Sequence, residues 1–270
     1  MTDYAGKTVV ITGGATGIGF GLAKAFGGKG ARIVIGEPRA DKLDEASQAL
    51  RDLGVEVSTF VMDVADPESV TAFADFAWDS YGAVHLLINN AGIAIERKAL
   101  PDVDLAEMRR LFDVNLFGVW HGASIFGKRM IEAGQPAAIY NVASENAFFN
   151  AVTKSAAYIA SKHAVRGLTE AMRDDFPDFI KVGMIVPGFV ASDLTAGSEA
   201  YAMSADEFAG KVVEQIEAGE FYVVTHGYNI ERIKPIHVAI EDAYARNAPR
   251  EEGDEKYDVQ LLIKRLRSGS

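Results

Sequence analysis

The stretch KTVVITGGATGIGFGLAKAF, residues 7–26, decides the fold class of this chain. A β-branched run, TVVIT, passes directly into a turn that contains Gly13, Gly17 and Gly19, and an apolar-periodic segment follows the turn. Such runs favour strands, and glycines let the backbone bend tightly before a helix. We therefore expect a first strand, a glycine turn and a first helix that begins near Ile18. A plain strand-to-helix turn is also glycine-rich, so the spacing alone does not establish a ligand.

Six further β-branched runs repeat along the chain, with helix-periodic segments between them. Such alternation is the signature of βαβ units, and nearly continuous apolar strands suit a parallel sheet that is covered on both faces. The sequence predicts an α/β fold, a doubly wound, Rossmann-like parallel sheet of about seven strands in a single domain. The six runs are RIVIG (32–36), EVSTFVM (56–62), HLLIN (85–89), AAIYNVA (137–143), KVGMIV (181–186) and FYVVTH (221–226).

The predicted domain spans residues 1–250, because no repeat, linker or change of composition divides it. The last twenty residues differ, with acidic EEGDEKYD followed by VQLLIKRLRSGS. We expect residues 251–270 to form a C-terminal tail that either packs on a neighbouring subunit or frays.

The composition excludes several classes of function. The chain has 270 residues, no cysteine and a formal net charge of -11. This charge argues against a nucleic-acid partner, and the apolar runs are too short to span a membrane. Without cysteine there are no disulfides or thiolate metal sites, and the five histidines lack metal-ligand spacing, so we expect no metal. A reducing cytoplasm fits, and the amino terminus has no secretory-signal pattern.

The glycine turn has the position that a dinucleotide site requires, after the first strand and before the first helix. Glycines there let the backbone approach a diphosphate, whose charge the helix amino terminus then stabilises. A second feature is AAYIASKHAV, residues 156–165, where Tyr158 and Lys162 are four positions apart. In a helix the two side chains share one face. They are either a catalytic pair or a lysine that extends past a partly buried tyrosine.

Together, the spacing T-G-x-x-x-G-x-G, the NNAG motif, a serine and Y-x-x-x-K resemble the short-chain dehydrogenase/reductase family, from residue 7 to about 195. The resemblance implies catalytic roles for Asn115, Ser144, Tyr158 and Lys162. It also implies cofactor-binding roles for Thr12, Gly13, Gly17, Ile18, Gly19, Glu37, Asp63, Val64, Asn90, Ala91, Gly92, Tyr158, Lys162, Pro187, Gly188, Val190 and Ser192. Two departures from the family pattern are Ser192, where threonine is usual, and Ala147, where glycine is common.

The chemistry of hydride transfer explains the tyrosine and the lysine. A phenol has a reference pKa of about 10, so it is a poor base near neutral pH. A charge about 4 Å away is worth on the order of 4 kcal/mol at an effective dielectric of 20, and we expect Lys162 to lower the pKa of Tyr158 in this way. Ser144 would hold the substrate oxygen, although a serine after a strand usually caps a helix. In the family pattern Asn115 orders a water, although such a residue also caps or bends helices.

The predicted activity is that of an oxidoreductase that moves a hydride between NAD(H) and a secondary alcohol or ketone. The expected substrate has an apolar or aromatic body, because Phe148, Phe149, Phe189 and Ile93 flank the inferred site; the exceptions are Arg97 and Lys98. The alternative is a non-catalytic sensor or scaffold that binds a nicotinamide nucleotide, since a fold does not imply a function.

Glu37 favours NAD over NADP. It ends the second predicted strand about twenty residues beyond the glycine turn, where an acid binds a ribose 2′-hydroxyl and repels a 2′-phosphate. Arg39 complicates this, because it could pair with a 2′-phosphate or with Glu37 or Asp41. Finally, the helix expected over VNLFGVWHGASIFGKRMI, residues 114–131, is apolar nearly all round. We therefore expect a homodimer or homotetramer.

Overall fold

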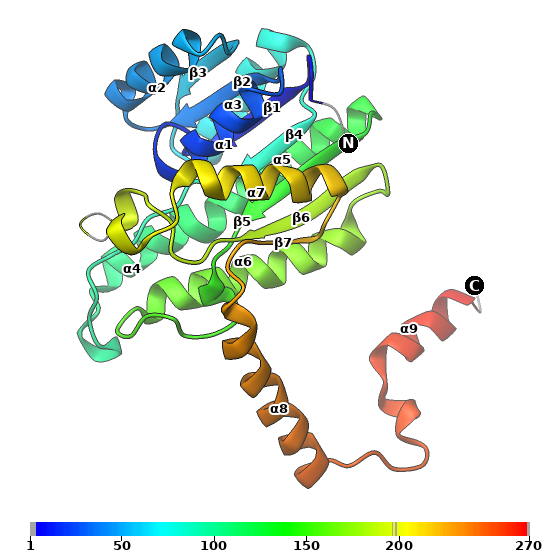
Figure 1. Cartoon of the computed structure of the whole chain (residues 1–270). Coiled ribbons are helices and arrows are strands. Elements are labelled where there is room, and N and C mark those ends of the chain that lie inside the picture. The colour runs from blue at the N-terminus through cyan, green and yellow to red at the C-terminus, as the bar shows by residue number, and fades with distance from the viewer. Residues whose placement is uncertain (1–3, 196, 198, 269–270) are drawn as a thin grey trace. The chain divides into compact units, whose positions relative to one another are not determined.

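The computed structural model describes residues 4–195, 197 and 199–268, which divide into two compact units at Gly227. The first unit contains a seven-stranded sheet in the order β3-β2-β1-β4-β5-β6-β7, in which every pair of neighbouring strands is parallel (Figure 1). This confirms the predicted doubly wound fold. The strands are β1 (Thr8–Thr12), β2 (Arg32–Glu37), β3 (Val57–Val61), β4 (Leu86–Asn89), β5 (Ala137–Val142), β6 (Ile180–Val186) and β7 (Tyr222–Val224).

Helices cover both faces of the sheet. Two large buried clusters form there, one beneath α1, α2 and α7 and the other beneath α3, α5 and α6. Because both faces are covered, the central strands β1, β4 and β5 are buried along their whole length, as a parallel sheet requires. The helices of this unit are α1 (Gly17–Gly27), α2 (Ala40–Asp52), α3 (Pro67–Tyr81), α4 (Leu105–Phe112), α5 (Gly118–Ala133), α6 (Ala156–Asp175) and α7 (Ala205–Ala218).

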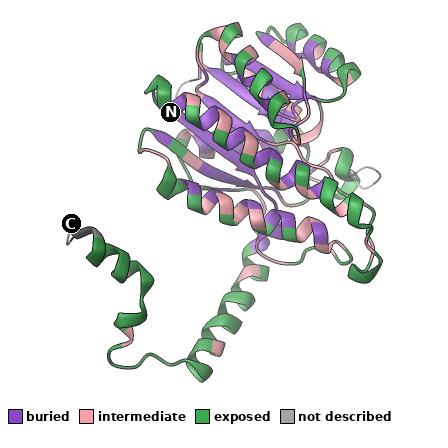
Figure 2. Cartoon of the chain, turned by 180° about the vertical axis from the view of Figure 1, so that it is seen from behind, coloured by how far each residue is buried: buried purple, intermediate pink, exposed green. Residues whose placement is uncertain are grey.

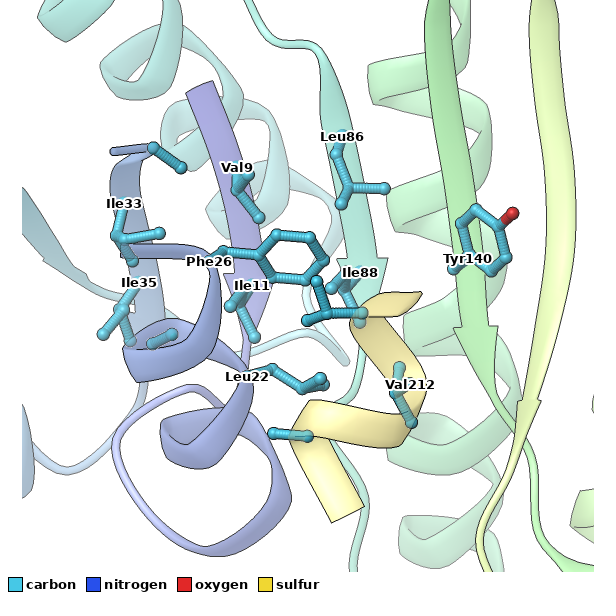
Figure 3. Close-up of a cluster of buried hydrophobic side chains, with 14 of the residues drawn as sticks. Val9, Ile11, Leu22, Phe26, Ile33, Ile35, Leu86, Ile88, Tyr140 and Val212 are labelled. Carbon is cyan, nitrogen blue, oxygen red and sulfur yellow. The ribbon is translucent and has the colours of Figure 1, made fainter. Parts of the chain in front are cut away.

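The first cluster explains why α1 lies against the sheet. Leu22 and Phe26 of α1 and Val212 of α7 point toward Val9 and Ile11 of β1 (Figure 3). All five side chains are fully buried. Each such burial stabilises the fold by about 1.5–3 kcal/mol relative to exposure. The packing fixes the start of α1 at the carboxyl end of β1.

The strand order reverses at β1, whose neighbours are β2 on one side and β4 on the other. In open α/β sheets ligands bind at such a reversal, in the crevice beyond the carboxyl ends of the strands. The segments that follow β1, β2, β4, β5 and β6 all emerge at this edge. They carry almost every residue that the sequence singles out for binding or catalysis.

The second unit, residues 228–270, contains α8 (Asn229–Asn247), a short 3-10 turn (Asp254–Tyr257) and α9 (Val259–Ser268). Its described residues are exposed along almost the whole segment (Figure 2). The domain boundary expected at residue 250 lies inside this unit, and the structure divides the chain earlier, at Gly227. Among the described residues, none of the helices combines the length and apolar character needed to cross a membrane.

Candidate active site

The glycine turn is packed so closely that side chains cannot be added to it. Gly13 and Gly17 have left-handed φ angles of 62° and 52°. A Cβ on Gly13 would lie 2.8 Å from the Ala91 Cα, and a Cβ on Gly17 would lie 2.8 Å from the Ser192 Cβ. The turn therefore touches the segments that follow β4 and β6. Since α1 begins at Gly17, the backbone N–H groups of its first turn are free to face an anion.

Thr12 and Asn90 hold this turn in place. The Thr12 hydroxyl accepts hydrogen bonds from the backbone N–H of Asn90 at 3.0 Å and of Ala91 at 3.1 Å. The Asn90 amide in turn donates to the carbonyl oxygens of Thr12 and Gly13, at 3.0 and 2.9 Å. Gly19 is a packing residue, because a Cβ there would collide with the Gly13 carbonyl oxygen. Neither Thr12 nor Gly19 lines the cavity, so both position its walls.

A cavity of about 450 Å³ lies at this edge of the sheet. Its walls bring together most of the residues expected in the site. This set of residues fits a dinucleotide cofactor. It includes an acid, Glu37, the glycine turn at the amino terminus of α1, and the hydroxyl groups of Ser144 and Tyr158. The expected residues on the walls are Gly13, Gly17, Ile18, Glu37, Asp63, Val64, Asn90, Ala91, Gly92, Ser144, Tyr158, Lys162, Pro187, Gly188, Val190 and Ser192.

Several residues on the same walls were not predicted from the sequence, namely Thr16, Arg110, Asp193, Leu194 and Thr195. Arg110 donates to the Asp63 carboxylate at 2.7 Å, across 47 positions of sequence. Thr16 lies inside the glycine turn, and this position in the sequence was the only indication that it would line the cavity. Arg110, Asp193, Leu194 and Thr195 lie in segments that contain no recognisable sequence motif.

Arg39 bridges two carboxylates on the cavity wall, those of Glu37 and Asp193. Its Nε donates to Glu37 Oε1 at 2.6 Å and its Nη1 donates to Asp193 Oδ2 at 2.8 Å. Glu37 is buried, with 4% of its surface exposed, at the end of β2. Hydrogen bonding to Arg39 is the main reason that the pKa of Asp193 is below its usual value. The pairing of Arg39 with Glu37 was one expected alternative; the partner Asp193 was not foreseen.

Ser144 and Tyr158 lie together where β5 ends and α6 begins. The Ser144 hydroxyl accepts a hydrogen bond from the Asn146 backbone N–H at 3.2 Å, so Ser144 also caps the 3-10 turn Glu145–Ala147. Burial raises the pKa of the Tyr158 phenol, and a hydrogen bond with Ser144 offsets part of this rise, while Glu145 adds to it. Both hydroxyls line the cavity, so they can meet one substrate oxygen.

The pKa of Tyr158 is raised above its usual value, contrary to expectation, because burial is the largest effect on the phenol. The Lys162 ammonium donates to the Val142 carbonyl oxygen at 3.0 Å and lies 5.7 Å from the centre of the Tyr158 ring. Burial lowers the pKa of Lys162 to about 8. Loss of water on burial is the largest cause of the pKa shift at both side chains, and the spacing of the two residues does not reveal it.

Asn115 lies in a π-helical turn, Asp113–Phe117, between α4 and α5. Its amide accepts from the Ile93 N–H at 2.8 Å and donates to the Ile93 carbonyl oxygen at 2.9 Å. A Cβ on Gly92 would lie 3.4 Å from Asn115 Oδ1 and 3.7 Å from Lys162 Nζ. Asn115 thus lies behind the wall near Lys162 and does not line the cavity. The helix expected over 114–131 is interrupted because the wider turn carries Asn115 inward.

A second cavity of about 540 Å³ adjoins the first and shares Ser144 and Tyr158 with it. Its apolar wall includes Phe189 as expected, together with Ala94, Ile95, Val103, Val152 and Leu194. Arg97 and Lys154 also line it. Lys98 is not on its wall and pairs instead with Glu96 at 2.8 Å.

Two of the expected substrate-facing phenylalanines lie elsewhere. Phe148 packs beside Tyr222 with ring centres 6.1 Å apart, and the Arg166 guanidinium lies 4.5 Å from its ring centre. Neither Phe148 nor Phe149 lines either cavity, while Ile93 lines the first one. The sequence places Phe148 close to Ser144, but the 3-10 turn directs its side chain to the packed side of β6 and β7.

Comparisons with known proteins agree with this geometry. The profile of the family described as short chain dehydrogenase matches residues 7–202. A 1-deoxy-11-beta-hydroxypentalenate dehydrogenase from Streptomyces avermitilis is 34% identical over 82% of this chain and 84% of its own. A 3-alpha-(or 20-beta)-hydroxysteroid dehydrogenase from Mycobacterium bovis is 36% identical over 70% and 71%.

Among solved structures, one from Burkholderia phymatum superposes with a TM-score of 0.84. It is described as a short chain dehydrogenase/reductase in complex with NAD, is 27% identical, and the match covers 93% of this chain and 99% of that one.

Proposed function

The chain belongs to the short-chain dehydrogenase/reductase family, and on this premise we propose that it transfers a hydride between NAD(H) and a secondary alcohol or the matching ketone. The supporting observation is that Ser144, Tyr158 and Lys162 stand on the wall of the cavity that the glycine turn opens. The nicotinamide, when bound, supplies the hydride acceptor or donor. The protein supplies the groups that orient the substrate and move its proton.

Tyr158 is the group that exchanges the proton of the substrate hydroxyl. It shares a hydrogen bond with Ser144, and the two hydroxyls border both the cofactor cavity and the adjoining cavity. Ser144 holds the substrate oxygen as charge develops on it. Lys162, buried one turn further along α6, orients the cofactor. The family pattern gives Asn115 the ordering of a proton-carrying water; here its side-chain amide is bonded to Ile93, so it also positions the wall near Lys162.

The preferred cofactor is NAD. Glu37 is buried at the end of β2, on the wall of the cavity, where it can accept hydrogen bonds from a ribose 2′-hydroxyl. A 2′-phosphate carries about -1.5 to -2 charges at neutral pH, so it would meet a carboxylate that cannot move away. Arg39 could offset this repulsion, but its guanidinium is already bound by two carboxylates.

The substrate has an apolar, alicyclic body. The cavity beside Tyr158 is large enough for a ring system and has an apolar wall. The two curated relatives reported above are named for a pentalenate and a hydroxysteroid, both of which are ring compounds that carry a hydroxyl. Arg97 and Lys154 line the same cavity, together with Glu96 and Glu145, and could pair with an acidic group on such a substrate.

The experiment is a screen of ring alcohols with the purified full-length chain. The panel contains cyclohexanol, 4-hydroxycyclohexanecarboxylate, a decalol and a 3α-hydroxysteroid, with 2-propanol as the acyclic control, and NADH formation is followed by absorbance. We expect turnover with at least one ring alcohol at a greater efficiency than with 2-propanol. Tight NADH binding without turnover of any member, in either direction, would favour the non-catalytic sensor instead.

Two further properties belong to this proposal. The protein acts as a homodimer or homotetramer, and residues 251–270 form a tail that either packs against a neighbouring subunit or frays. The exposed apolar residues of α9, Val259, Leu262 and Ile263, are available for such packing. It works in the cytoplasm, and the absence of cysteine from the chain is consistent with a reducing compartment.

A further inference from the structure

We propose that Asp193 determines cofactor preference, by holding the Arg39 guanidinium away from any 2′-phosphate. The inference rests on the proposed function, because it assumes that a nicotinamide dinucleotide binds in the first cavity. It assigns specificity to a residue that lies outside the β2 end, where the acid Glu37 stands. Asp193 comes directly after Ser192, in the segment beyond β6.

Every nitrogen of the Arg39 guanidinium already has an acceptor. Nε donates to Glu37 at 2.6 Å, Nη1 donates to Asp193 at 2.8 Å, and Nη2 donates to the Thr16 hydroxyl at 3.3 Å. Thr16 in turn donates to the same Asp193 oxygen at 3.0 Å. Arg39, Thr16 and Asp193 therefore form a closed arrangement, in which three of the five guanidinium N–H groups are used and two carboxylates fix where the guanidinium lies.

The two carboxylates differ in how readily they could release the arginine. The Glu37 side chain is 5% exposed and stands at the end of a central strand, so it is fixed. The Asp193 side chain is 59% exposed and belongs to a one-turn 3-10 helix, Asp193–Thr195. Loss of the Asp193 charge would leave Glu37 on Nε and weaken the bond that holds Nη1, so the outer N–H groups of the guanidinium could turn toward a phosphate. Guanidinium groups bind phosphate through such paired N–H donors.

The local charge supports the same conclusion. Glu37, Arg39 and Asp193 together carry a net charge of -1, which disfavours a 2′-phosphate, and without the Asp193 charge the Glu37–Arg39 pair is neutral. The segment that carries Asp193 is held independently, because the Thr195 hydroxyl accepts from the Ser192 N–H and donates to the Val190 carbonyl oxygen, each at 2.9 Å. Neutralising Asp193 should therefore leave its own segment folded.

The test compares NADH and NADPH affinities in Asp193→Asn, by fluorescence titration at fixed ionic strength and without substrate. Asparagine keeps the size of the side chain and its contact with Thr16, and loses only the charge. We expect the affinity ratio to shift toward NADPH by about tenfold or more, mainly through tighter NADPH binding. The matched control is Asp206→Asn, which removes the same charge from an ion pair with Lys24 that lies outside both cavities.

A second variant distinguishes a role of Asp193 in cofactor specificity from a purely structural role in the segment after β6. If Arg39 mediates the effect, adding Arg39→Ala to Asp193→Asn should abolish the gain in NADPH affinity. Equal weakening of both cofactors by Asp193→Asn, or a gain that survives Arg39→Ala, would overturn the inference while leaving the proposed function intact. If the wild-type protein binds neither NADH nor NADPH, the proposed function itself fails.

Discussion

Lys162 is a buried ammonium that donates a hydrogen bond to a backbone carbonyl and lies near the Tyr158 ring. It is 4% exposed, it donates to Val142 at 3.0 Å, and burial lowers its pKa to about 8. A lysine in the unfolded chain has a pKa of about 10.4, so at neutral pH the folded state carries a charge that it disfavours. The protein retains this residue at a cost in stability, which is typical of catalytic sites.

Replacing Lys162 with methionine should therefore stabilise the cofactor-free protein. We expect Lys162→Met to raise the free energy of unfolding at pH 7 by about 2 kcal/mol, after allowing for the lost hydrogen bond to Val142. Between about pH 8 and pH 10 the unfolded wild-type chain binds more protons than the folded one, so wild-type stability rises with pH. The advantage of the variant should shrink over this window.

Urea unfolding of both proteins at pH 7, 8, 9 and 10 measures this effect. The control is Lys181→Met, at an exposed position of β6, for which the difference from wild type should stay constant with pH. An advantage of Lys162→Met that does not change between pH 7 and pH 10 would show that burial does not perturb this lysine.

At the scale of an element, the π-helical turn Asp113–Phe117 links the helix layer to the cavity wall. Its residue Asn115 makes both backbone hydrogen bonds to Ile93, which follows the NNAG motif. We expect Asn115→Ala to lower the free energy of unfolding by about 1–3 kcal/mol, because it leaves the Ile93 N–H and carbonyl without these partners. It should also weaken NADH binding, since Gly92 and Ile93 line the cavity.

The matched control for this prediction is Asn247→Ala. The Asn247 amide donates to the Ala243 carbonyl oxygen within the exposed helix α8, so its loss should change stability by less than about 0.5 kcal/mol. Chemical denaturation and NADH titration give both quantities. An Asn115→Ala protein that is as stable as wild type and binds NADH equally well would remove the role of this turn.

The elements that the sequence predicted correctly are those with a local pattern. All seven strands follow from β-branched runs bounded by glycine or polar residues, and the glycine turn follows from its place between β1 and α1. The π-helical turn could not be predicted, because its apolar letters also fit a regular helix. The contact between Arg39 and Asp193 spans 154 positions, so it depends on the folded sheet and has no signature in either local stretch.

The directions of the pKa shifts in the site could not be predicted from the sequence either. Spacing correctly places Tyr158 and Lys162 within the same helix, α6. It does not say how much water either side chain loses, and this loss sets the direction of both pKa shifts. Phe148 shows the same limit, because its closeness to Ser144 in the sequence did not determine where its ring packs.

At the scale of the whole molecule, exposed apolar residues on α5 and the turn before it suggest an interface. Phe117, Trp120 and Ile131 are 47%, 54% and 45% exposed. With helical spacing these positions fall on one side, so a second copy could cover them together. We expect the full chain to have a solution mass that is a multiple of 29.1 kDa, and Trp120→Glu to lower it.

Light scattering over a range of protein concentrations tests this expectation. Leu53→Glu is the control, since Leu53 is 64% exposed but lies just beyond α2, away from those residues in the sequence, and it should leave the mass unchanged. A wild-type mass near 29 kDa at every concentration would rule out the oligomer.

The central claim is that Tyr158 exchanges a proton with the substrate while a nicotinamide bound beside it exchanges the hydride. The most direct measurement is the turnover of Tyr158→Phe on any alcohol that the wild-type protein oxidises, together with its NADH affinity and thermal stability. The substitution removes only the phenol oxygen, so we expect both binding and stability to stay close to wild type. Turnover should fall by at least about a hundredfold. Residual activity within tenfold of wild type, with the variant correctly folded, would contradict the assignment.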